Sequence, residues 1–271
     1  MQALAERLDA FLRGATLERV DILQFSSLKT VAVAPDDVVD RTLVRVVRRG
    51  KFLVLELGGP RVLVHLSQGG RVDVELPPKR TKPRGAVGRL SFIKGPSVLV
   101  KEFGKERKAG LWILGEGDEG PLARLGPEPS SRSFEDLIMR GDDHRRVHTI
   151  LRDQRTVAGI GRGYSDDSMH AARLSPFATL ASLSAEERTG LLASIRKVLA
   201  DALDVERQRA GGLPTKLGDH FTVHGRSGEP CPACGQDLRR VSYDSYEVTY
   251  CPGCQTRGKV LADRRMSRLL R

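Results

Sequence analysis

The chain has 271 residues, enough to bury a sizeable core in one large domain or two modest ones. Its 45 lysine and arginine residues outnumber 34 acidic residues, and the net charge of +11 favours a polyanionic partner such as nucleic acid over a merely soluble basic protein. The apolar runs are far shorter than the roughly 20 residues that span a bilayer, and no signal sequence opens the chain. We therefore expect a cytoplasmic protein with no membrane partner.

The first predicted element is an amphipathic helix over residues 2–13. Leu4, Leu8 and Leu12 recur at helical spacing. Gly14 follows as a stop signal. No Ser, Thr, Asp or Asn precedes the helix to satisfy its first backbone N–H groups. We therefore expect that the printed chain begins inside an element.

Strand-like segments follow the helix. Apolar runs separated by glycine, proline and charged residues predict short strands, and their spacing is typical of a sandwich or barrel. These segments cover residues 16–23, 43–57, 61–66, 71–76, 88–93, 97–103 and 110–114. The stretch PPKRTKPR at residues 77–84 is a poor strand because of its prolines. It predicts a basic loop, either solvated or in contact with nucleic acid.

Helical periodicity replaces the strand pattern in the middle of the chain. Ser133 begins a short predicted helix that continues to Ile138. A second short helix covers residues 147–151. Ser184, with Glu187 three residues later, forms a capping box ahead of a long apolar stripe. These segments predict an all-helical layer.

All four cysteines lie near the end of the chain, in CPAC (Cys231 and Cys234) and CPGC (Cys251 and Cys254). Two CxxC pairs at this separation supply four thiolates for a tetrahedral zinc site. A cytosolic chain disfavours two disulfides, and redox-active CxxC motifs need a thioredoxin-like context that is absent here. Because sulfur fills all four positions, we expect one structural Zn²⁺ with no catalytic role. Residues 241–250, between the pairs, alternate as in a β-hairpin.

Several motifs together resemble one known family. VHGRSGEPCPACG followed by YCPGCQ resembles the C-terminal zinc finger of the formamidopyrimidine-DNA glycosylase and endonuclease VIII family. LRDQRTVAGIGRGYSDDSMHAARLSP is similar to the helix-two-turns-helix motif of that family, and LGPEP, RRGKFLVLEL and VHLSQGGRV match as well. The resemblance covers nearly the whole chain, with its motifs in order.

The resemblance implies an α+β fold in three parts. An N-terminal β-sandwich with the first helix is expected over residues 1–115, a helix-two-turns-helix domain over 116–212, and a zinc-finger hairpin with four cysteine ligands over 213–271. The family holds double-stranded DNA, damaged or abasic, in the cleft of this clamp. We expect a monomer associated with the nucleoid.

The resemblance also implies a bifunctional DNA glycosylase and AP lyase of base-excision repair. In the family, a damaged base is flipped out, an N-terminal proline amine attacks the sugar C1′, a neighbouring glutamate handles the proton, and a Schiff base leads to elimination. Lys51 matches a lysine of the family's active site. The proline and glutamate are absent from the printed chain, so we expect either a true start upstream or a catalytically inactive protein that binds damaged DNA or structured RNA. A zinc-ribbon module on an unrelated β domain is a third interpretation.

The Gly-Ile-Gly turn of the helix-two-turns-helix motif implies phosphate contacts. Gly159 and Gly161 match the glycines whose neighbouring N–H groups face DNA in the family. Arg162 stands where the family usually has an asparagine that contacts phosphate. The resemblance thus assigns this turn to DNA binding, with an added positive charge.

Other positions depart from the family pattern at expected DNA contacts. Gln68 stands where many members have a methionine that fills the space left by the flipped base, and His148 replaces a frequent lysine. Tyr246 occupies the place of a zinc-finger arginine that contacts phosphate. The basic residues near Tyr246 in sequence, which we expect to compensate, are Arg226, Arg257 and Lys259. These departures leave the identity of the damaged base open.

Overall fold

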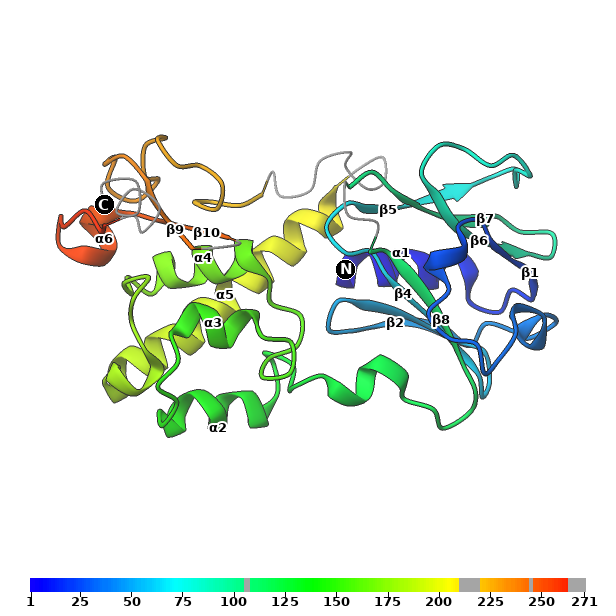
Figure 1. Cartoon of the computed structure of the whole chain (residues 1–271), viewed down its shortest axis with the longest axis horizontal. Coiled ribbons are helices and arrows are strands. Elements are labelled where there is room, and N and C mark those ends of the chain that lie inside the picture. Colours follow the sequence, from blue (N-terminus) through cyan, green and yellow to red (C-terminus); the bar gives the residue numbers. More distant parts are fainter. Residues whose placement is uncertain (105–107, 210–219, 244–245, 263–271) are drawn as a thin grey trace. The chain divides into compact units, whose positions relative to one another are not determined.

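The computed structural model describes residues 1–104, 108–209, 220–243 and 246–262 (Figure 1). The chain divides into two compact units, one built mainly from Met1–Ala123 and the other from Arg124–Glu206 with the C-terminal region. Each unit has an apolar core of its own. Among the described residues, no helix is both long enough and apolar enough to cross a bilayer.

The first unit is a β-sandwich, which confirms the strand pattern of the sequence. Its strands are β1 (Leu17–Ile22), β2 (Arg45–Arg49), β3 (Phe52–Glu56), β4 (Arg61–His65), β5 (Gly70–Glu75), β6 (Ala86–Phe92), β7 (Ser97–Glu102) and β8 (Gly110–Leu114). One antiparallel sheet has the order β1-β6-β7-β5 and the other has the order β2-β3-β4-β8. Short 3-10 helices lie at Phe25–Ser27, Pro35–Val38 and Gly120–Arg124.

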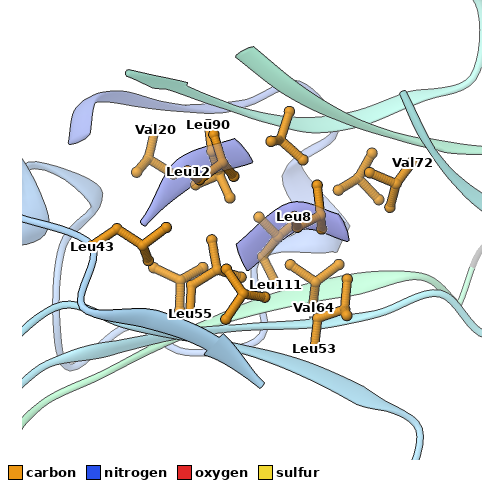
Figure 2. Packing of buried hydrophobic residues seen from close by; sticks show 14 of the residues in the cluster. Leu8, Leu12, Val20, Leu43, Leu53, Leu55, Val64, Val72, Leu90 and Leu111 are labelled. Carbon is orange, nitrogen blue, oxygen red and sulfur yellow. The ribbon is translucent and has the colours of Figure 1, made fainter. Parts of the chain in front are cut away.

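Helix α1 (Gln2–Leu12) supplies its apolar stripe to the core of the sandwich. Leu8 and Leu12 are buried among side chains of both sheets, including Leu55 of β3 and Leu90 of β6 (Figure 2). Burial of each leucine contributes about 2 kcal/mol to the free energy of unfolding. The helix begins without a side-chain cap, as the sequence predicts.

The turn between β4 and β5 requires glycine at two positions. A Cβ atom on Gly69 would lie 2.4 Å from the backbone nitrogen of Gly104, and one on Gly70 would lie 2.2 Å from the carbonyl oxygen of Leu66. Both neighbours are backbone atoms, so a side chain at either position would displace the chain. This turn carries Gln68, whose side chain is exposed.

A buried ion pair anchors the basic loop at residues 77–84. The Nε of Arg89 donates to a carboxylate oxygen of Glu75 at 2.9 Å, and the two side chains are only 1% and 9% exposed. The Nη2 of Arg89 also donates to the backbone carbonyl of Thr81 at 2.7 Å. The loop is irregular, as predicted, but its backbone is tied to the sheet near the midpoint of the loop.

The second unit contains the predicted helical layer. Its helices are α2 (Arg132–Arg140), α3 (Val147–Arg152), α4 (Arg162–Ala171) and α5 (Ala185–Gln208), with a 3-10 helix at Leu180–Ser182. The capping box at the start of α5 is confirmed, because the Ser184 hydroxyl accepts from the N–H of Glu187 at 3.2 Å and the Glu187 carboxylate accepts from the N–H of Ser184 at 2.9 Å.

Helix α2 begins at Arg132, one residue before the predicted start at Ser133. Ser131 is the N-cap, and its hydroxyl accepts the backbone N–H of Phe134 at 3.2 Å. An N-cap hydroxyl has to reach an N–H group two or three residues further on. Ser131 meets this requirement, and Ser133 lies inside the first turn.

The C-terminal part of the second unit has the predicted hairpin. Strands β9 (Arg239–Ser242) and β10 (Glu247–Tyr250) pair antiparallel, and α6 (Pro252–Thr256) follows them. The predicted boundary at residues 212 and 213 lies outside the described residues, so the division into three domains stays a prediction.

Candidate metal centre and nucleic-acid interface

The four cysteine side chains converge, as their spacing predicts. The Sγ atoms of Cys231 and Cys254 lie 3.8 Å apart, and those of Cys234 and Cys251 lie 3.4 Å apart. A tetrahedral zinc ion with Zn–S bonds of about 2.3 Å holds its sulfur ligands roughly 3.8 Å from one another. The donor set and its spacing therefore fit one zinc ion.

The pKa values of the thiols are also consistent with a bound cation at this site. The backbone N–H of Gln236 and the neighbouring thiols lower the pKa of Cys234 to about 7. Burial raises the pKa of Cys251 and of Cys254. A bound cation would offset that cost, because metal ligation requires the thiolate form.

His170, on α4, is a fifth donor in the same place. Its Nε2 lies 3.2 Å from the Sγ of Cys231. The ligand atoms of His170, Cys231, Cys251 and Cys254 all lie within 4.8 Å of one another. The sequence did not single out this histidine, because it lies in a helix far from the cysteine motifs along the chain.

Two neighbouring aspartates of α4 hold the backbone of the zinc-finger region. The carboxylate of Asp167 accepts the N–H groups of residues 222–224 at 2.8 to 3.1 Å. The carboxylate of Asp166 accepts the N–H of Thr249 at 3.1 Å and lies 2.6 Å from Nδ1 of His224. Burial raises the pKa of Asp166. One buried polar face of α4 therefore positions the cysteine-bearing segment.

The Gly-Ile-Gly turn leads directly into α4. The Gln154 side chain holds the turn, because its Nε2 donates to the carbonyl of Ile160 at 2.7 Å and its Oε1 accepts the N–H of Gly159 at 3.0 Å. Gly159 has a φ of 92°, and Gly161 is the N-cap of α4 with no side-chain cap. Arg162, the first residue of α4, is exposed. The positive end of the helix dipole and the arginine charge together favour an anion here.

Helix α3 and the β9–β10 hairpin meet in an aromatic-arginine cluster made of Arg146, His148, Arg152, Tyr243 and Tyr246. The two tyrosine rings stack with centroids 4.7 Å apart and an interplanar angle of 17°. The Arg152 guanidinium carbon lies 3.6 Å from the Tyr246 ring centroid. Arg146 donates to the Tyr243 hydroxyl at 2.9 Å. The cluster therefore presents two cations beside stacked aromatic rings.

His148 is the buried member of this cluster. Its side chain is 1% exposed, and its Nε2 has no hydrogen-bond partner among the described residues. Burial, with the charges of Arg152 and Arg146, lowers the pKa of His148 to about 4. At neutral pH the imidazole is uncharged, and the positive charge near it comes from the two arginines.

Lys51 and Gln68 lie in the β-sandwich unit. Lys51 follows Gly50 in the turn between β2 and β3, where Gly50 has a φ of 57°. Burial and the charge of Lys51 lower the pKa of His65, on the neighbouring strand β4. The fold thus brings Lys51 near an uncharged imidazole.

The other predicted cations lie around the zinc finger. Arg226 is paired with Glu229, with Nε 2.8 Å from the carboxylate. Arg257 ends α6 in a left-handed conformation and is exposed, as is Lys259. The structure places neither Arg257 nor Lys259 in the aromatic-arginine cluster; Arg146 and Arg152, which the sequence analysis missed, are its cations.

The comparisons with known proteins agree with this geometry. Residues 1–102 match the family model described as the formamidopyrimidine-DNA glycosylase N-terminal domain, and residues 125–211 match the formamidopyrimidine-DNA glycosylase H2TH domain. The formamidopyrimidine-DNA glycosylase of Thermus thermophilus is 33% identical to this chain. The match spans 95% of this chain and 97% of the Thermus protein. A Mycobacterium tuberculosis protein is 44% identical over 151 residues, which are 54% of this chain and 94% of that protein. It is described as an uncharacterized formamidopyrimidine-DNA glycosylase-like protein.

Solved structures give the same result. The crystal structure of the Thermus thermophilus protein matches with a TM-score of 0.79 and 30% identity, over 93% of this chain and 96% of that one. A Lactococcus lactis formamidopyrimidine-DNA glycosylase bound to DNA with an AP site has a TM-score of 0.81 at 20% identity, over 94% and 97% of the two chains, and supports the fold. The chain belongs to the formamidopyrimidine-DNA glycosylase family.

Proposed function

We propose that this protein is a DNA glycosylase of base-excision repair that removes damaged bases from double-stranded DNA and cleaves the resulting abasic site. Membership of the formamidopyrimidine-DNA glycosylase family over nearly the whole chain is the observation that carries the proposal. The same membership favours an enzyme over a binding protein without activity. We further propose that the protein acts as a cytoplasmic monomer at the nucleoid.

DNA binding is proposed for the second unit, where helix N-termini and arginines coincide. The N–H groups at the start of α4, after Gly159 and Gly161, and the exposed Arg162 would contact backbone phosphates. Arg152 would supply a further phosphate contact, because its guanidinium stacks on Tyr246 and has no carboxylate partner among the described residues. Arg226, Arg257 and Lys259 would add charge at the rim of the zinc finger.

Zinc is proposed as the bound metal, held by Cys231, Cys234, Cys251 and Cys254. Its role when bound is to fix the hairpin and the segment before it, because four sulfur ligands leave no open position for a substrate. The finger is then rigid enough for Tyr246 to keep the Arg152 guanidinium at a fixed place.

The catalytic residues are proposed in the β-sandwich unit. Lys51 would place its ammonium group at the abasic sugar and its phosphate, beside the uncharged His65. Gln68 would enter the base stack in place of the flipped nucleotide, because it lies exposed in a turn whose two glycines pack closely against neighbouring backbone. Base release also requires a nucleophilic amine, for which a terminal amine is chemically suited, since its usual pKa is near 7.7.

Borohydride trapping tests this function directly. The purified 271-residue chain is incubated with a duplex that contains one abasic site, and cyanoborohydride reduces any Schiff base to a stable covalent adduct. The family's attacking amine belongs to an N-terminal proline that this sequence lacks, so the same chain preceded by the family's Pro-Glu leader is tested beside it. We expect a protein–DNA adduct and strand cleavage at the abasic site from that longer form. Duplexes with single oxidised or ring-opened bases then identify the base that is released.

Two matched measurements make the result decisive. Lys51→Gln removes the proposed ammonium group and is expected to reduce trapping, while Arg132→Gln changes an exposed arginine of α2 and should leave it unchanged. Tight binding to the abasic duplex with no adduct and no cleavage by either form would show that the chain is a binding protein and not an enzyme.

A further inference from the structure

The zinc centre has more donors around it than a tetrahedral ion accepts. The two CxxC pairs supply four sulfurs, and Nε2 of His170 lies 3.2 Å from the Sγ of Cys231 and within 4.8 Å of the Cys251 and Cys254 sulfurs. Both residues are buried, with His170 8% exposed and Cys231 3% exposed. Water therefore has little access to this imidazole–thiol contact, so the hydrogen-bonding state of the pair is set by the protein.

The chemistry of four thiolates explains why a hydrogen-bond donor is useful there. Four thiolates and one Zn²⁺ carry a net charge of −2, and N–H groups directed at the sulfurs offset that charge. Backbone donors already serve this purpose, because the N–H of Ala233 lies 3.4 Å from the Cys231 sulfur and the N–H of Cys254 lies 3.5 Å from the Cys251 sulfur.

The two CxxC pairs favour donation over ligation by His170. A nitrogen and a sulfur bound to the same tetrahedral zinc, at about 2.0 and 2.3 Å, would lie roughly 3.5 Å apart. The observed separation of 3.2 Å is shorter, but so is the 3.4 Å between the sulfurs of Cys234 and Cys251, and this distance therefore does not decide the role of His170. Since Cys234 completes the set of four sulfurs, no coordination position remains for the imidazole.

We propose that His170 is a positioning residue of the metal centre, whose Nε2–H donates a hydrogen bond to the Cys231 thiolate and ties helix α4 to the bound metal. The histidine lies on the same helix as Asp166 and Asp167, which hold the backbone of the finger. The helix that begins at the Gly-Ile-Gly turn therefore contacts the metal centre through a ligand as well as through the surrounding backbone. Metal retention and the placement of α4 are coupled by this bond.

Metal affinity measured with three variants tests the proposal. His170→Phe keeps the ring volume and removes the donor, and His170→Gln keeps a side-chain N–H. We expect the affinity for Zn²⁺, measured by competition with a chromophoric chelator, to fall about 10- to 100-fold in His170→Phe. His170→Gln is expected to recover most of the loss. His144→Phe, a change at an exposed histidine of the same unit, is the matched control and should bind zinc as the natural chain does.

Cobalt substitution separates a hydrogen-bond donor from a ligand. With Co²⁺ alone as the probe, the natural chain and His170→Phe should both show the absorption of four sulfur ligands, with the sulfur-to-cobalt charge-transfer band shifted in the variant. A spectrum of three sulfurs and one nitrogen in the natural chain would make His170 a ligand and overturn the proposal, as would unchanged zinc affinity in His170→Phe. These measurements need no DNA, so their outcome is independent of the proposed repair activity.

Discussion

Tyr246 carries the guanidinium of Arg152 on its ring, with the guanidinium carbon 3.6 Å from the ring centroid. Planar stacking of this kind restricts the arginine without neutralising it. A cation that is held in place and has no carboxylate partner among the described residues is suited to a phosphate group. We propose that Arg152, on a different element, supplies the charge that the family resemblance places at the position of Tyr246.

Arg152→Gln tests this charge at the level of one residue. The variant should bind an abasic duplex more weakly, and the slope of log affinity against log salt concentration should become about 0.9 less steep, since one phosphate contact is lost. Fluorescence anisotropy over a series of salt concentrations measures both quantities. Arg132→Gln is the matched control, because Arg132 is 81% exposed and paired with Asp136. If the slope is unchanged in Arg152→Gln, then Arg152 does not contact a DNA phosphate.

His148 makes the stability of the second unit depend on pH. Its pKa is about 4 in the folded chain and near 6.5 when unfolded. Between these values the unfolded chain binds a proton that the folded chain does not, so stability is fully present above pH 6.5 and decreases as the pH falls toward 4. The loss attributable to His148 is about 2 to 3 kcal/mol at pH 4.

The comparison of the natural chain with His148→Phe isolates this effect. Other histidines and carboxylates are common to both proteins, so the difference in their unfolding free energies with pH reports His148. Urea unfolding at pH 7.5 and pH 5 is expected to show a smaller loss of stability in the variant. A difference that does not change with pH would mean that the imidazole titrates normally.

At the scale of the elements, the buried pair of Glu75 and Arg89 links β5 and β6 within one sheet. Glu75→Gln leaves the Arg89 guanidinium buried without a full counter-charge, and we expect a loss of about 3 kcal/mol. The double variant Glu75→Gln/Arg89→Met removes the uncompensated charge and should regain part of that loss. Trp112 of β8, the single tryptophan of the chain, reports the unfolding of this unit by fluorescence. Equal stability of all three proteins would show that the pair contributes nothing.

The sequence predicts those elements whose signals are local. The periodicity of Leu4, Leu8 and Leu12 is sufficient to predict α1, and the spacing of the cysteines is sufficient to predict that their side chains converge. The predicted start of α2 was wrong by one residue, because Ser131 and Ser133 are both acceptable near a helix start by composition and the backbone path decides between them. Local signals therefore fix the type of an element better than its ends.

The contacts between elements were beyond sequence analysis. Nothing in the chain marks Arg152 as the partner of a tyrosine in a distant hairpin, or His170 as a neighbour of Cys231. Such pairs depend on how helices and hairpin pack, which is a tertiary property. The spacing of Asp166, Asp167 and His170 on one helix was an available signal for a polar buried face.

For the whole molecule, the two units carry separate spectroscopic reporters. The four tyrosines are Tyr164, Tyr243, Tyr246 and Tyr250, all in the second unit, and Trp112 is in the first. Removal of zinc with a strong chelator should change the near-ultraviolet circular dichroism of the tyrosines and abolish DNA binding. The urea midpoint reported by Trp112 should stay the same, because each unit has its own apolar core. A shift of the Trp112 midpoint would show that the two units unfold together.

The hydrogen bond from buried Arg89 to the carbonyl of Thr81 restricts the basic loop before any partner arrives. Fixing the backbone of one residue costs about 1–2 kcal/mol of conformational entropy, and this loop has lost part of that freedom during folding. Its exposed cations, on both sides of Thr81, are Lys79, Arg80, Lys82 and Arg84. When a polyanion binds this preorganised loop, fewer loop residues have to be ordered than in a loop that is not anchored. Breaking the hydrogen bond to Thr81 would therefore lower the affinity of the loop for a polyanion. The loop would keep all its positive charges, but binding would cost more conformational entropy.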